Sequence, residues 1–218
     1  MVSTTACKWD TIIPFEPLWE QYERVIKDNG AMVLTASQPF TSALVMSNPK
    51  LFKYSLVWDK VNSSSGLHAK IQPLRSHEDV LVFSRGKPVY FPQMETAQRR
   101  IDKEREIPNG EAFSGKRKKR VYDNKGEKYP KSVIRISNAN QRGKTHPTQK
   151  PVALFEYLIR TYTNEGEVVL DNCIGSGTTA IASLNTGRFF IGIEMDERYH
   201  QVATKRVREW HDERGLFT

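Results

Sequence analysis

The sequence has few of the residues that hold small secreted or metal-binding proteins together. Its 218 residues include only two cysteines, Cys7 and Cys173, too few for a disulfide framework or a cysteine-rich metal cluster. No apolar stretch approaches the roughly 20 residues that a membrane-spanning helix requires, and the N-terminus lacks the pattern of a signal peptide. These absences predict a cytoplasmic protein that has no membrane partner.

Two common phosphate-binding patterns are also missing. The main glycine turn lies within Asp171 to Thr179, DNCIGSGTT, and contains neither the GxGxxG of dinucleotide-binding folds nor the GK[ST] of a P-loop. The turn therefore favours an adenosine ligand without a phosphate over a phosphate ligand.

What surrounds this turn is typical of a ligand-binding edge in an α/β fold. A short apolar run, Val168 to Leu170, ends at Asp171 and predicts a buried parallel strand. Gly175 and Gly177 follow, and glycine permits backbone angles closed to other residues and a close approach of a ligand. Ligands of such folds bind at the C-terminal ends of strands.

A helix and a second strand are expected to follow the turn. Thr178 and Thr179 are predicted to cap the helix. Phe189 to Ile193 is again apolar and ends in Glu194, 17 positions after Gly177. Nucleotide folds bind ribose hydroxyls with an acidic residue in this place.

The rest of the chain alternates between strand-like and helix-like segments. The pattern predicts a doubly wound, Rossmann-like α/β sheet with some antiparallel strands at one edge. Expected strands are 31–36, 53–60 and 79–84, expected helices are 14–27, 150–163, 196–210 and one after Pro39, and 62–74 is expected to be a loop. In the last helix the expected buried residues are Tyr199, Val202, Val207 and Trp210.

Positive charge is concentrated in one segment. The chain has a net charge of +8, and Glu95 to Gly143 alone contain 14 Lys and Arg against 7 Asp and Glu. The densest part is Lys116, Arg117, Lys118, Lys119 and Arg120. Such a run is either a solvated loop or a contact surface for a polyanion, and its place between two halves of a nucleotide fold favours the second interpretation.

These motifs together resemble the S-adenosylmethionine-dependent amino-methyltransferases that act on DNA. DNCIGSGTT resembles their motif I, D-P-F-x-G-S-G-T-T, and His146 to Val152, HPTQKPV, resembles their motif X. Motif X, motif I and an acidic second strand near the C-terminal end follow the order of the permuted β class. Arg75, His77 and Glu78 match an R-x-H-E pattern of the family, in which His77 and Glu78 either position the active-site loop or support a strand.

The resemblance implies S-adenosylmethionine as cofactor and assigns its binding residues. Asp171 and the turn from Gly175 to Gly177 are expected to hold the methionine portion, Glu194 the ribose, and Thr148 and Lys150 the methionine carboxylate. Thr178, at the end of the turn, is a further cofactor-binding candidate. Asn172 and Cys173 replace the usual Pro-Phe, which leaves less apolar surface for the cofactor.

The resemblance also implies a division of the chain and a partner. Residues 1–92 would form the catalytic half, 93–143 a basic target-recognition insert, and 144–218 the cofactor-binding half. The partner would be double-stranded DNA, contacted by Lys116 to Arg120 through its phosphates.

The family's catalytic tetrapeptide, [D/N/S]-P-P-[Y/F], does not occur in the sequence. In relatives a segment like Thr4 to Asp10, TTACKWD, follows that motif, and here only Met1 to Ser3 precede it. We therefore expect a sheet that lacks the strand carrying the motif, through truncation or as a natural variant. An unpaired edge would then favour a homodimer or a completing polypeptide.

Two classes of function follow. The first is a site-specific adenine-N6 DNA methyltransferase of a restriction-modification type, with little activity expected from this chain alone. The second is a catalytically silent DNA- or cofactor-binding protein or subunit on the same scaffold. An RNA methyltransferase is a third and less favoured alternative.

Overall fold

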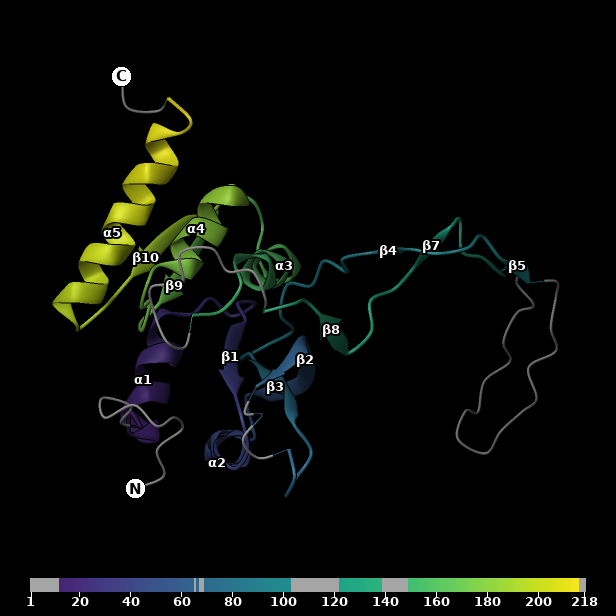
Figure 1. The fold of residues 1–218 in the computed structure, drawn as a ribbon, viewed down its shortest axis with the longest axis horizontal. Coiled ribbons are helices and arrows are strands. Elements are labelled where there is room, and N and C mark those ends of the chain that lie inside the picture. Colours follow the sequence, from purple (N-terminus) through teal and green to yellow (C-terminus); the bar gives the residue numbers. More distant parts are fainter. Residues whose placement is uncertain (1–11, 65, 67–68, 103–121, 139–148, 216–218) are drawn as a thin grey trace. The chain divides into compact units, whose positions relative to one another are not determined.

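The computed structural model describes residues 12–64, 66, 69–102, 122–138 and 149–215 (Figure 1). It divides the chain into two units, which we call the main unit (1–91 with 132–218) and the insert unit (92–131). The elements are α1 (Phe15–Val25), β1 (Met32–Ala36), α2 (Phe40–Ser47), β2 (Phe52–Ser64), β3 (Arg75–Phe83), β4 (Glu95–Thr96), β5 (Ile101–Asp102), β6 (Tyr122–Asp123), β7 (Glu127–Lys128), β8 (Val133–Arg135), α3 (Val152–Tyr162), β9 (Val168–Asp171), α4 (Thr178–Asn185), β10 (Phe189–Gly192) and α5 (Glu197–Asp212). The expected α/β fold is confirmed.

The larger sheet of the main unit has the strand order β1-β3-β2-β8, with β3 antiparallel to both neighbours and β8 parallel to β2. Val80, Leu81, Val82 and Phe83 of β3 are completely buried. Because successive strand residues point to opposite faces, Leu81 and Phe83 pack with residues of α1 and α2, whereas Val80 and Val82 pack with residues of α3. Helices therefore cover both faces of this sheet.

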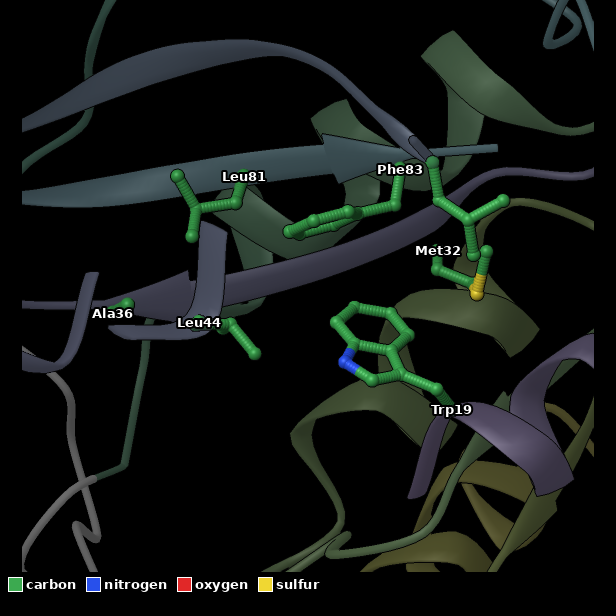
Figure 2. Packing of buried hydrophobic residues seen from close by; sticks show 7 residues of the cluster. Trp19, Met32, Ala36, Leu44, Leu81 and Phe83 are labelled. Carbon is green, nitrogen blue, oxygen red and sulfur yellow. The ribbon is translucent and has the colours of Figure 1, made fainter. Parts of the chain in front are cut away.

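Trp19 anchors α1 to the larger sheet. Its ring centroid lies 4.8 Å from that of Phe83, and its indole N–H donates to Ser47 Oγ of α2 at 2.8 Å. Figure 2 shows the indole beneath Phe83 and facing Met32 of β1. Large rings with a satisfied polar atom bury much apolar surface, so this contact holds α1, α2 and the sheet together.

The smaller sheet pairs β9 with β10 in parallel. The predicted burial of β9 on both faces is wrong, because Val168 is 56% and Leu170 is 42% exposed. Phe189 and Ile191, their partners on β10, are also exposed. These four side chains share one face, while α4 contacts both strands. A strand is buried on both faces only when other elements pack on each face, and among the described residues the exposed face of this sheet has no such covering element.

The two sheets are not hydrogen-bonded to each other in the described part of the chain: β9 pairs only with β10, and β1 only with β3. Helix α1 and the residues after it bridge them. Tyr22 Oη donates to Asn172 Oδ1 at 2.9 Å, and Lys27 Nζ lies 2.8 Å from Glu167 Oε1. The absence of the strand that carries the catalytic motif and the association of copies both remain predictions.

Strands β2 and β3 extend further than the sequence pattern predicts. Strand β2 extends to Ser64, so the prediction places the start of the following loop, residue 62, too early. Pairing passes from Asp59 to Ser64 across an irregularity in which Val61 adopts φ 66°. A bulge hides the regular alternation from which strands are predicted.

In α5, Ala203 is the one described residue that is buried, and the four side chains expected to be buried are half-buried. The helix packs against the glycine turn at Ala203, and Trp210 Nε1 donates to Asn185 Oδ1 of α4 at 2.6 Å.

The insert unit contains two short antiparallel pairs, β4 with β7 and β5 with β6. Ion pairs join Arg99 to Asp123 at 2.7 Å and Lys128 to Glu95 at 2.9 Å. The basic run from Lys116 to Arg120 lies outside the described residues, so its contact with DNA stays a prediction. No described helix is long and apolar enough to cross a membrane.

Candidate cofactor site

Asp171, the last residue of β9, holds the glycine turn in shape. Its Oδ1 accepts the main-chain N–H of Cys173 at 3.0 Å, and its Oδ2 accepts the hydroxyl of Thr179. The carboxylate thus ties the end of the strand to the first turn of α4. Charged acceptors make stronger hydrogen bonds than neutral ones, so the turn is well fixed.

The predicted capping of α4 by the two threonines is wrong. Gly177 is the N-cap and no side chain caps the helix. The Thr179 hydroxyl bonds Asp171, and the Thr178 hydroxyl donates to the carbonyl of Lys150 at 3.4 Å. Both hydroxyls are engaged by longer-range partners, which the local pattern of a capping residue does not reveal.

Gly177 is required by both its conformation and its neighbour. Its φ is +82°, a region that other residues rarely adopt. A Cβ at this position would lie 3.0 Å from the Cβ of Ala203 and 3.1 Å from its Cα. Helix α5 therefore packs directly against the backbone of the turn.

Glu194 lies beside the turn, as its place after β10 predicts. Its Oε2 accepts the main-chain N–H of Gly175 at 2.8 Å, and its Oε1 accepts that of Asp196 at 2.9 Å. The structure therefore brings Glu194 and the glycine turn together. Their contact with a cofactor stays a prediction.

The segment before α3 rests on the same turn. Gln149 Oε1 accepts the hydroxyl of Ser176 at 3.0 Å, and the Lys150 carbonyl accepts that of Thr178. The structure thus places the main chain of Lys150 next to the turn, while its contact with the methionine carboxylate stays a prediction. Thr148 lies outside the described residues, so its assignment to the cofactor stays a prediction.

Two residues at the turn were missed from the sequence. Gln149 is one, and the other is Arg206 of α5, whose Nη1 donates to the carbonyl of Ser176 at 2.5 Å. Burial lowers the pKa of the Arg206 guanidinium. Gln149 could have been predicted from its position within the HPTQKP segment. No pattern in the sequence around Arg206 predicts its contact with the turn.

The ends of β9 and β10 carry negative charge. Burial, followed by the charges of the Cys173 thiolate and Asp171, raises the pKa of Tyr22 to about 12. Desolvation and the carboxylates of Asp171 and Glu194 raise the pKa of the Cys173 thiol. Such a site favours a ligand with a cationic group or hydroxyl donors.

Comparison with known proteins identifies the family. A family model described as DNA methylase matches residues 8–205. DNA adenine methyltransferase YhdJ of Escherichia coli (strain K12) is 30% identical over 189 residues, which are 84% of this chain and 62% of that protein. Type II methyltransferase M2.DpnII of Streptococcus pneumoniae is 47% identical over 62 residues, or 28% of this chain and 23% of that protein. The chain thus spans less than two thirds of these relatives.

Solved structures agree with the family match. The crystal structure of the M1.HpyAVI–SAM complex superposes with a TM-score of 0.62 at 28% identity, covering 89% of this chain and 85% of that chain. PvuII DNA methyltransferase (cytosine-N4-specific) has a TM-score of 0.62 at 16% identity, with 94% and 76% covered, and shows the fold alone. The chain belongs to the DNA methylase family of adenine-N6 and cytosine-N4 methyltransferases, which use S-adenosylmethionine.

Proposed function

We propose that this chain binds S-adenosylmethionine at the C-terminal ends of β9 and β10 and is the cofactor-binding body of an adenine-N6 DNA methyltransferase. One observation carries the proposal: Glu194 accepts the N–H of Gly175 at 2.8 Å, so the acidic strand end and the glycine turn form one site. Similarity to YhdJ favours adenine as the target base, and the positive charge of the insert favours DNA as the substrate.

The residues present fit this cofactor. A carboxylate has about four acceptor positions, and hydrogen bonds from the described residues use two at Asp171 and two at Glu194. Glu194 therefore has acceptors left for ribose hydroxyls, and Asp171 for an ammonium group. The carboxylate of Asp171 also suits the positive sulfonium, from which the family transfers a methyl group.

The remaining site residues supply position and charge balance. The turn from Gly175 to Gly177 lets the ligand approach the main chain closely. Lys150, whose carbonyl is held at the turn, offers an ammonium to the methionine carboxylate. Binding by these groups orients the cofactor for transfer, and positioning of this kind accounts for much of the rate of such reactions.

Calorimetric titration of the purified chain with S-adenosylmethionine tests the proposal. Asp171→Ala removes the acceptor that fixes the turn, and we expect binding at least about tenfold weaker, since a hydrogen bond to a charged group contributes about 1.5–3 kcal/mol. Asp212→Ala, at the last residue of α5, is a control with no expected effect. Wild-type binding that Asp171→Ala leaves intact would reject the site.

The absence of [D/N/S]-P-P-[Y/F] from the 218 residues and the interrupted sheet favour a second candidate, a catalytically silent binding protein. Transfer of a labelled methyl group to DNA separates the two. Turnover above background supports an enzyme, whereas cofactor and DNA binding without turnover supports the silent protein.

A further inference from the structure

Three charged side chains link the larger sheet to the segment that rests on the glycine turn. Lys60 Nζ of β2 lies 2.6 Å from Glu78 Oε1 of β3, and Glu78 Oε2 lies 3.7 Å from Lys150 Nζ. The side chains of Lys60, Glu78 and Lys150 are only 10%, 21% and 22% exposed, respectively. Ions removed from water in this way are costly unless they are paired, so the contacts are unlike ordinary surface ion pairs.

Lys60 and Glu78 are held by the sheet itself. Trp58 pairs with Glu78 in the β2–β3 register, and Lys60 lies two residues further along the same face of β2. The ammonium of Lys60 is 5.5 Å from the Trp58 ring centroid, and the indole N–H donates to the Ile136 carbonyl at 2.8 Å. Lys60, which packs against the buried Trp58 ring, therefore holds Glu78 in place.

Glu78, and not its neighbour His77, contacts Lys150. His77 pairs with Asp59, lies on the opposite face of β3 and is exposed. From Glu78 the connection continues through Lys150, whose carbonyl accepts the Thr178 hydroxyl. The adjacent Gln149 accepts the hydroxyl of Ser176, which is 3% exposed.

The cluster has one carboxylate for two ammonium groups, and the carboxylate is closer to Lys60 than to Lys150. Glu78 therefore orients Lys150 without neutralising both lysines. We propose that Glu78, held by Lys60, is a positioning residue that fixes Lys150 and its segment against the glycine turn, so that the Lys150 ammonium is aimed at the carboxylate end of the cofactor. This inference rests on the proposed function, because it names S-adenosylmethionine as the ligand.

Cofactor affinity and hydrogen exchange test the proposal together. Glu78→Gln keeps the shape and removes the charge, and we expect binding of S-adenosylmethionine to weaken about tenfold, as for loss of one charged contact. Glu78→Asp should recover part of the affinity. Glu95→Gln makes the same change in an exposed ion pair, with Lys128, and should change nothing.

A structural readout separates positioning from simple charge removal. In the absence of cofactor, Glu78→Gln should accelerate hydrogen exchange several-fold in the peptide from Ile174 to Thr178, whereas Glu95→Gln should not. If the single variant unfolds because Lys60 is left unpaired, the double variant Lys60→Met with Glu78→Gln removes both charges and is expected to show the same two effects.

Unchanged exchange in the turn, or unchanged or tighter cofactor binding by Glu78→Gln, would overturn the positioning role, since tighter binding would mean that Glu78 competes for Lys150. If the wild-type chain binds no S-adenosylmethionine, the proposed function fails, and the exchange measurement alone then decides whether Glu78 holds the turn.

Discussion

Gly175 donates its main-chain N–H to the carboxylate of Glu194 at 2.8 Å, across the ends of two parallel strands. This contact joins the glycine turn to the acidic strand end, which lie 19 positions apart in the sequence. The carboxylate keeps acceptor positions for a ligand, and Gly175 beside it is only half-buried. The proposed binding of an adenosine ligand depends on this relationship.

Replacing Gly177 with alanine should destabilise the protein. The alanine would have to adopt φ +82° and would place its Cβ 3.0 Å from that of Ala203. Gly166 is a matched control, because it has φ +76° and a Cβ added there would meet nothing within 4 Å. Urea denaturation should show a loss of about 1 kcal/mol for Gly166→Ala and about 1–3 kcal/mol more for Gly177→Ala. Equal losses of stability in the two variants would mean that α5 can move away from residue 177 without a cost in free energy.

The ion pair between Lys27 and Glu167 should make stability depend on pH in the acid range. The hydrogen bond from Lys27, then that from Asn164, holds the pKa of Glu167 below its usual value. A lowered folded-state pKa gives stability that is present above the unfolded pKa of about 4.3 and is lost as the pH falls through the folded value. Because Lys27 is 70% exposed, the contribution should stay below about 1 kcal/mol.

Denaturation of the wild-type chain and Lys27→Met between about pH 3 and pH 6 measures this effect. The stability difference between them should shrink as the pH falls. A stability difference that stays constant over this pH range would show that Lys27 does not lower the pKa of Glu167 in the folded protein.

The thiol of Cys173 should react slowly with alkylating agents. Its pKa is raised by desolvation and by the carboxylates of Asp171 and Glu194, and only the thiolate is a nucleophile. In a Cys7→Ser background, iodoacetamide should modify Cys173 more slowly than a free cysteine at about pH 8, and Glu194→Gln should accelerate the reaction. A rate that Glu194→Gln leaves unchanged would show that the Glu194 carboxylate does not raise the pKa of the thiol.

Local patterns were sufficient for the parts of the site that are contiguous in sequence. The strand, turn and helix around Gly175 and the place of Glu194 follow from apolar runs and glycine spacing. The contacts of Arg206 and Lys60 do not, because each depends on packing between segments far apart in the chain. The hydrophobic periodicity of one segment does not predict which distant segment it will contact.

The exposure of the smaller sheet illustrates the same limit. Val168 and Phe189 lie in runs that are typical of buried strands, yet they are 56% and 67% exposed. Burial depends on which elements lie next to a strand, and in the described residues β9 has a strand neighbour on one edge only. The apolar pattern indicates the strand but not its neighbours.

The 218-residue chain by itself should show little methyltransferase activity. It contains no [D/N/S]-P-P-[Y/F] tetrapeptide, whose acceptors the resemblance places next to the target amine. Loss of a single electrostatic contributor of this kind costs about 10²–10³ in rate. Incubation with labelled S-adenosylmethionine and duplex DNA measures the activity, with YhdJ as a positive control. Robust turnover would contradict this expectation.

The most direct test of the cofactor site compares Glu194→Gln with wild type for two ligands, S-adenosylmethionine and an analogue that lacks the ribose hydroxyls. Glu197→Gln, three residues further along, is the control variant. If Glu194 accepts the ribose hydroxyls, calorimetry should show about tenfold weaker binding of S-adenosylmethionine to Glu194→Gln and equal binding of the analogue to both proteins. Equal affinities for S-adenosylmethionine, or the same loss for both ligands, would contradict the proposed site.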